Sequence, residues 1–176
     1  KNGKVYLLCT DGVAEFDLTT QRFKTLLQGN VDAIYFNEKL YIGKREEVFV
    51  YNESTGNFDL YYHLAGKDIT LSCLHLDEKK NLWMGTTSNG LYCLSGDKKI
   101  SQPVTRGNIA SIYEDSSKEL WICTWEEGLY RIKTDSTIEN FRHDPKNPNS
   151  ICTDFVRSCC EDNAGNLWIG TFHGLN

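Results

Sequence analysis

The sequence predicts an all-β protein built of short antiparallel strands. Aromatic and β-branched residues gather in short runs, Pro occurs only three times, and no window of helical length keeps a clean 3.6-residue period. A Leu-Trp motif, followed by a small residue, Thr and then Gly-Leu, recurs at 81–94, 119–132 and 166–176. Its copies lie about 40 residues apart, the length of one four-stranded propeller blade. We therefore expect a β-propeller of four-stranded antiparallel blades.

Aromatic anchors mark the repeat along the whole chain. Two weaker copies, 4–16 and 39–51, carry Tyr in place of Trp, so the five anchors are Tyr6, Tyr41, Trp83, Trp121 and Trp168. An Asp lies six residues before each Trp, at Asp77, Asp115 and Asp162. We expect each Asp to bond backbone amides of a tight turn. Because the Trp recurs at one structural position, we expect it to pack blade against blade.

Each unit reads as four strands in order. Strand A (for example 70–76) leads through the Asp turn to strand B at the anchor, a short link leads to strand C at Gly-Leu, and a polar strand D such as 137–143 follows. The units cover approximately 1–28, 30–64, 68–104, 107–143 and 151–176. The first begins at strand B and the last ends as strand C starts. We therefore expect about four blades from a larger propeller, rather than a closed four-bladed ring.

Four segments resemble a known family. EDNAGNLWIGT (161–171), its relatives at 77–86 and 115–124, and HDPKNPNSICTDFVRS (143–158) are similar to the two-component regulator propeller repeats of hybrid two-component systems in gut Bacteroidetes. The resemblance is strongest from 68 to 176. It implies a seven-bladed periplasmic sensor domain of a membrane histidine kinase that responds to a carbohydrate or other nutrient. The kinase domain would lie outside this segment, which itself would not be an enzyme.

Two other functions remain open from the sequence. The propeller could be a protein-interaction or dimerisation scaffold without a small ligand, self-associating through open blade edges, or it could be a glycosidase or polysaccharide lyase. The net charge of −5 with scattered Lys and Arg argues against a nucleic-acid partner. The chain lacks an apolar run long enough to span a membrane, so membrane contact is expected only through flanking segments.

Cysteine and histidine patterns predict no metal site and no cofactor. The seven cysteines show no metal-ligand spacing and mostly occupy strand positions, which predicts buried, reduced thiols. Cys159 in particular shares the slot of Leu74 and Ile112 and is expected to be buried and unpaired. Cysteines without a recognisable disulfide framework favour, by themselves, a reducing compartment, so the cytoplasm is the alternative to the periplasm. The cysteines are Cys9, Cys73, Cys93, Cys123, Cys152, Cys159 and Cys160.

Candidate ligand residues follow from strand direction. Strands alternate up and down, so the B–C links and the D–A connections emerge on one face of the propeller, and ligand sites favour loops on a rigid scaffold. Trp125 is the strongest candidate, because it lies outside the repeated Trp slot, beside two carboxylates. The candidates are Arg45, Glu46, Thr87, Ser88, Asn89, Trp125, Glu126, Glu127, Phe172 and His173.

Overall fold

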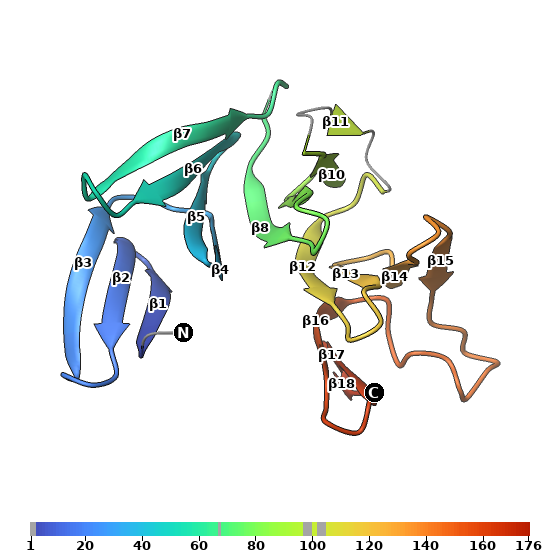
Figure 1. Ribbon diagram of the computed structural model, residues 1–176. Helices are drawn as coiled ribbons and strands as arrows, with labels where there is room; N and C mark the ends of the chain where they lie inside the picture. Colours follow the sequence, from blue (N-terminus) through green and yellow to red (C-terminus); the bar gives the residue numbers. More distant parts are fainter. Residues whose placement is uncertain (1–2, 67, 97–99, 102–104) are drawn as a thin grey trace. The chain divides into compact units, whose positions relative to one another are not determined.

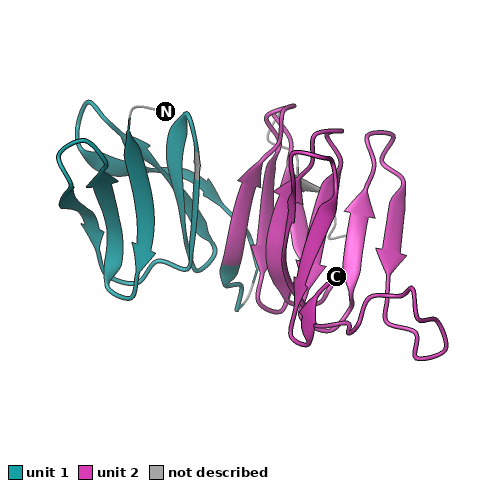
Figure 2. Cartoon of the chain, turned by 90° about the horizontal axis from the view of Figure 1, so that it is seen from below, with its two compact units in different colours: residues 1–71 teal, residues 72–176 magenta. Residues whose placement is uncertain are grey.

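The protein is described by a computed structural model that covers residues 3–66, 68–96, 100–101 and 105–176 (Figure 1). The chain forms two compact units, residues 1–71 and 72–176, which we describe separately (Figure 2). Every regular element in the described ranges is a β-strand, so the all-β prediction is confirmed. No described helix is long and apolar enough to cross a membrane.

The first unit contains two antiparallel sheets. A three-stranded sheet has the order β1-β2-β3 and a four-stranded sheet the order β4-β5-β6-β7. Val13 of the first sheet and Leu40 and Ile42 of the second form a shared buried core. The strands are β1 (Lys4–Cys9), β2 (Gly12–Asp17), β3 (Arg22–Gln28), β4 (Ala33–Asn37), β5 (Lys39–Lys44), β6 (Glu47–Asn52) and β7 (Asn57–His63).

The second unit contains three sheets, of which the first starts at the boundary residue Leu71. Two are four-stranded, with the orders β8-β9-β10-β11 and β12-β13-β14-β15, and the third has the order β16-β17-β18. Their strands are β8 (Leu71–Leu76), β9 (Leu82–Thr86), β10 (Leu91–Leu94), β11 (Ile100–Ser101), β12 (Ile109–Glu114), β13 (Leu120–Thr124), β14 (Leu129–Ile132), β15 (Ile138–Phe141), β16 (Val156–Glu161), β17 (Leu167–Thr171) and β18 (Gly174–Leu175).

Buried side chains fill the seams between neighbouring sheets of this unit. Leu91, Ile109 and Ile122 belong to one cluster between the first two sheets, and Cys123 and Val156 to another between the last two. A sheet of four short strands cannot bury both faces by itself, whereas neighbours stacked on each face can. Consecutive four-stranded antiparallel sheets with apolar seams confirm the predicted propeller blades.

The Asp turns explain the six-residue spacing to Trp. Oδ1 of Asp115 accepts the amide of Glu119 at 2.9 Å, which confirms the predicted turn. Oδ2 of the same carboxylate accepts Nε1 of Trp121 at 2.8 Å. Asp77 and Asp162 bond Trp83 and Trp168 in the same way, at 2.9 and 2.8 Å. The Asp thus fixes both the turn and the indole ring of the following strand.

The recurring Trp residues pack as predicted where a following sheet is present. Trp83 packs against the cluster that contains Leu120, and Trp121 packs against the cluster that contains Val156. Trp168 lies in the sheet β16-β18, which has a neighbouring sheet on one side in its unit, and this Trp is 43% exposed. The burial of the repeated Trp therefore depends on the next blade.

The thiols differ from the prediction of buried cysteines. Cys123 is buried, Cys73, Cys93 and Cys159 are half-buried, and Cys9, Cys152 and Cys160 are exposed. Full burial of Cys159 is therefore a wrong prediction. Cys159 packs against the cluster that contains Cys123 and Val156 but is only half-buried, as is Ile112 in the same slot, so the slot shared with the buried Leu74 does not ensure full burial.

Candidate functional site

The B–C links and D–A connections meet on one face of the sheets. The amide of Trp125 donates to the carbonyl of Asn108 at 3.1 Å, and the amide of Phe172 donates to the carbonyl of Phe155 at 3.0 Å. In each pair a B–C link contacts the connection that enters the same sheet. The predicted placement of these two loop types on a common face is therefore confirmed for the second unit.

A surface pocket of about 370 Å³ opens at the B–C link that follows β13. It lies within the second unit and combines one aromatic ring, two carboxylates and an amide side chain. The sequence singled out four of its residues and missed Gly107 and Asn108, which belong to the D–A connection. The pocket is lined by Thr87, Gly107, Asn108, Trp125, Glu126 and Glu127.

Trp125 is held from two sides. Its backbone amide is bonded to Asn108, and the guanidinium carbon of Arg157 on β16 lies 4.9 Å from the centre of its ring. Such a stack is a cation–π contact. The indole is half-buried. Trp125 therefore joins two blades and also presents part of its ring to the pocket.

Glu127 carries the fixed carboxylate of the pocket. Its Oε2 accepts the phenol of Tyr130 at 3.1 Å and the hydroxyl of the buried Thr105. Its amide donates to Thr124 Oγ1 at 2.9 Å. Burial raises the pKa of Tyr130, and the hydrogen bond to Glu127 raises it further. The carboxylate is thus oriented by two hydroxyl donors, while the neighbouring Glu126 side chain is exposed.

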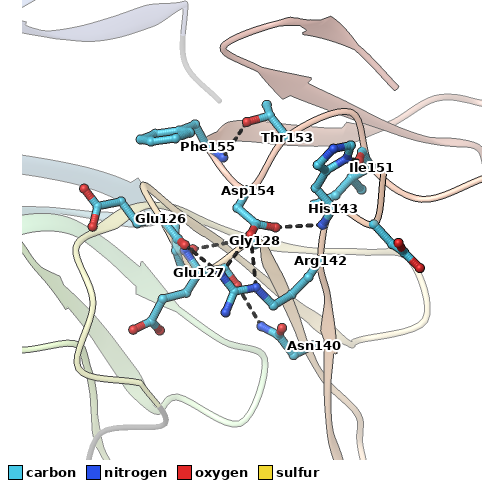
Figure 3. Close-up of polar contacts among 12 residues, drawn as sticks. Glu126, Glu127, Gly128, Asn140, Arg142, His143, Ile151, Thr153, Asp154 and Phe155 are labelled. Atoms are coloured by element: carbon cyan, nitrogen blue, oxygen red, sulfur yellow. Dashed lines mark hydrogen bonds and ion pairs between the residues drawn. The ribbon is translucent and has the colours of Figure 1, made fainter. Parts of the chain in front are cut away.

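An ion pair holds the backbone of the pocket's link (Figure 3). Arg142 donates from Nε and Nη2 to Oδ2 of Asp154 at 3.1 and 2.8 Å, and Nη2 also donates to the carbonyl of Glu126 at 3.0 Å. The Asp154 carbonyl accepts the amide of Gly128 at 3.0 Å. Two residues of the connection between β15 and β16 therefore position the B–C link between β13 and β14.

The charge state of Asp154 follows from these contacts. Burial by itself would raise its pKa, but the hydrogen bonds from Arg142 and from the His143 amide outweigh burial and lower it. The amide of His143 donates to Oδ1 at 2.7 Å. Asp154 is consequently ionised at neutral pH and provides a stable anchor for the link.

Gly128 is required where strand C begins. Its φ is 78°, and a Cβ there would collide with the carbonyl oxygen of Phe141. Glycine reaches this backbone conformation without the steric cost that other residues incur. The Gly of the repeated Gly-Leu therefore allows strand C to start directly beside the end of strand D.

The other predicted residues do not line this pocket. Arg45 and Glu46 belong to the first unit, where the Arg45 amide donates to Asp32 Oδ2 at 2.5 Å. Ser88 donates to the side chain of Asn89 at 3.0 Å. Phe172 is 65% exposed, with its ring 6.5 Å from that of Phe155, and His173 is exposed.

The described side chains do not form a metal centre. No group of three or more His, Cys, Asp or Glu residues in these ranges is arranged to hold a metal ion. The pocket instead offers acceptor oxygens, an amide and an indole. This set suits a ligand with hydroxyl or amine donors and an apolar face.

Similarity to known proteins was found in sequence and in structure. Residues 150–173 match the two component regulator propeller family. No curated protein matches the sequence. The fold matches the extracellular domain of BT4673 from B. thetaiotaomicron, assigned as a hybrid two component system, with a TM-score of 0.82, 21% identity, and 98% of this chain and 25% of that chain covered.

Two further solved structures share the fold. The extracellular domain of BT3049 from the same organism, also assigned as a hybrid two component system, matches with a TM-score of 0.79, 22% identity, and 98% and 24% of the two chains covered. Virginiamycin B lyase from Staphylococcus aureus matches with a TM-score of 0.75 and 14% identity, and the match covers 100% of this chain and 66% of the lyase chain. This chain spans about a quarter of the length of the two Bacteroides proteins. The resemblance to two component regulator propellers is confirmed at residues 150–173.

Proposed function

We propose that this chain is part of the extracytoplasmic sensor propeller of a two-component system histidine kinase. The family match at residues 150–173 and the fold shared with two Bacteroides extracellular domains support this function. Their extracellular location supports the periplasm over the cytoplasmic alternative drawn from the cysteines. The kinase chemistry belongs to other parts of the full protein, which reaches the membrane through flanking segments.

The pocket at Trp125 is the proposed ligand site, and its ligand is a carbohydrate or a similar polyhydroxylated nutrient. One observation carries this assignment: an indole and two carboxylates meet in one pocket on a face made of loops. The apolar face of a sugar ring packs on an indole, while its hydroxyls donate to carboxylate oxygens. The two Glu residues also disfavour acidic sugars, because like charges repel.

The segment acts by binding rather than by catalysis. Virginiamycin B lyase shares the fold, but a shared fold at 14% identity does not transfer an activity. The oriented carboxylate of Glu127 accepts two hydroxyl hydrogen bonds within the protein, from Tyr130 and Thr105. Glu127 therefore positions the link. A general base, in contrast, must be free to accept a proton from the substrate.

Self-association is the second candidate function, and one feature of the first unit favours it. Strand β1 forms the edge of its sheet, and three of its apolar side chains, Val5, Leu7 and Leu8, are 38, 37 and 41% exposed. An exposed apolar edge strand offers unpaired backbone groups to another strand. A second copy of the chain, or its neighbour in a sensor dimer, is the partner proposed for this edge.

Calorimetric titration with neutral oligosaccharides tests the ligand site. Replacing Trp125 with Ala should weaken binding about tenfold or more, as expected for about 1.4 kcal/mol of lost contact. Trp168→Ala is the matched control, because that indole lies outside the pocket. Equal affinities of the wild type and Trp125→Ala would remove the pocket from the proposal. Sedimentation of wild type and Leu7→Lys over a range of concentrations tests the self-association candidate.

A further inference from the structure

Two departures from the repeat face each other across a blade seam. Cys123 occupies the position that holds Gly85 and Gly170 in the neighbouring units, and Cys159 occupies the position of Leu74 and Ile112. Their Sγ atoms lie 3.7 Å apart, between β13 and β16. Each residue breaks the pattern of its own strand, and together they place two thiols in contact on adjacent blades.

We propose that Cys123 and Cys159 form a reversible inter-blade disulfide under oxidising conditions. A disulfide requires Sγ atoms about 2.05 Å apart, so the sulfurs must approach by less than 2 Å from their present contact. Side-chain rotation provides movement on this scale. This proposal does not depend on which ligand the propeller binds.

The backbone around the pair is already held at a short separation. Ser111 Oγ on β12 donates to the carbonyl of Arg157 on β16 at 3.0 Å, and the amide of Glu161 donates to the phenol of Tyr113 at 3.1 Å. These bonds connect the same two sheets on both sides of Cys159. The cross-link would therefore form within a seam that is fixed before oxidation.

In this unit the position of Cys123 accommodates a side chain. A Cβ at Gly85 would collide with Cys73 Sγ, whereas the residue paired with Cys123 is the smaller Ser111. Cys123 is fully buried and Cys159 is half-buried, so a reagent reaches Cys159 first. Burial raises the pKa of Cys73 to about 12, which keeps that nearby thiol protonated and unreactive.

The chemistry is two thiol–disulfide exchange steps with oxidised glutathione or the disulfide of an oxidoreductase. Cys159 loses its proton, attacks one reagent sulfur and forms a mixed disulfide, and the other reagent sulfur leaves as a thiol. Cys123 then loses its proton and attacks Cys159 Sγ, which releases the second reagent thiol. Two cysteine thiols are oxidised, and one reagent disulfide is reduced to two thiols.

The hydrogen bond between the two thiols influences the first step. It lowers the pKa of Cys123 and raises that of Cys159, with burial adding to the second shift. Because the thiolate is the nucleophile, the first step should be slow at neutral pH and faster as the pH rises. In the mixed disulfide Cys159 has no proton left to donate, so the second step depends on the contact between the two sulfurs and not on the lowered pKa of Cys123.

The cross-link would lie beside the proposed ligand site. Trp125 follows Cys123 by two residues and Arg157 precedes Cys159 by two, and these outer residues form the cation–π contact at 4.9 Å. The disulfide and the stack are thus successive contacts along one seam. Oxidation would fix the distance between the two blades that hold the indole.

Peptide mapping of the folded 176-residue chain tests the proposal. After incubation with oxidised glutathione and alkylation of the remaining thiols, trypsin should release residues 119–131 linked to residues 158–176. Dithiothreitol should separate the pair. The Cys160→Ser variant removes the exposed neighbouring thiol. It should still give the linked peptides, which would assign the disulfide to Cys159.

Two further variants complete the test. Cys123→Gly introduces the residue that Gly85 and Gly170 provide at this position, and Cys159→Leu introduces the residue that Leu74 provides. Each variant should therefore fold and lose the linked peptide. Glutathione adducts on residues 158–176 without any link to 119–131 would overturn the proposal. So would a link that disappears in Cys160→Ser and persists in Cys159→Leu, because Cys160 would then be the partner.

Discussion

The indole Nε1 of Trp121 and Oδ2 of Asp115 are joined by a 2.8 Å hydrogen bond across the turn between β12 and β13. The other oxygen of the same carboxylate accepts the Glu119 amide. One side chain therefore closes the turn and fixes the ring that packs in the seam to the next blade. The repeated Asp and Trp act as one structural element.

Replacing Asp115 with Ala should destabilise the protein by about 1–3 kcal/mol, because a half-buried indole donor and a turn amide both lose their acceptor. Chemical denaturation measures the change. Asp162→Ala is the matched control and should cost less, since Trp168 is 43% exposed and water can replace the lost acceptor. Equal losses for the two variants would contradict the role assigned to the seam.

Asp162 should stay ionised at unusually low pH. Hydrogen bonds from the Asn166 side chain, then from Trp168 Nε1 and the Asn166 amide, lower its pKa. A lowered folded-state pKa contributes stability that is complete above the ordinary value of about 3.9 and is lost as the pH falls through the folded value. Carboxyl NMR titration should place the midpoint below 3.9.

Two variants test the causes of this shift. Asn166→Ala should raise the Asp162 midpoint more than Trp168→Phe, because the Asn166 side chain provides the larger effect. A midpoint that does not move in either variant would show that these hydrogen bonds do not lower the pKa.

The Arg142–Asp154 pair should contribute mainly through Asp154. Asp154 accepts the Arg142 guanidinium and the His143 amide, whereas Arg142 is largely exposed, with 54% of its side chain accessible. Arg142→Gln should therefore cost no more than about 1 kcal/mol, as for other exposed ion pairs. Asp154→Ala should cost more, because it also leaves the backbone amide without its acceptor.

A double-mutant cycle isolates the pair itself. In the Asp154→Ala background, Arg142→Gln should have little further effect on the free energy of unfolding measured by denaturation. A full additive loss would mean that Arg142 stabilises the chain through its bond to the Glu126 carbonyl rather than through the carboxylate.

The fold could be predicted because its signals are local. Asp115, Trp121 and Gly128 lie within one unit, and each specifies a turn, a packing position or a strand start near itself in sequence. Repetition at a fixed period then identified the blade. The face that holds Trp125 followed from strand direction alone.

The supporting contacts of the site could not be predicted in the same way. Arg157 meets Trp125, and Asp154 reaches the link at Glu126, only because neighbouring sheets stack, and no local pattern encodes those distances. The prediction that Cys159 is buried was wrong for a related reason: a shared slot predicts the side of the strand on which a residue lies, but its contacts with the facing sheet determine how completely it is covered.

Thiol reactivity in the folded protein provides the last prediction. Cys9, Cys152 and Cys160 are exposed and should be alkylated by iodoacetamide before the buried Cys123. Among them Cys152 has a direct cause for enhanced reactivity: its hydrogen bond with the Thr171 hydroxyl, then the one from the Asn176 side chain, lower its pKa. A lower pKa gives more thiolate at pH 7, and the thiolate is the reacting form.

Thr171→Val should therefore slow Cys152 alkylation at pH 7, measured by peptide mass spectrometry, while Thr171→Ser, which keeps the hydroxyl, should preserve the rate. Cys9, which lies in the first unit, is the internal reference and should react equally in all three proteins. An unchanged Cys152 rate in Thr171→Val would show that the hydroxyl does not set the ionisation of this thiol.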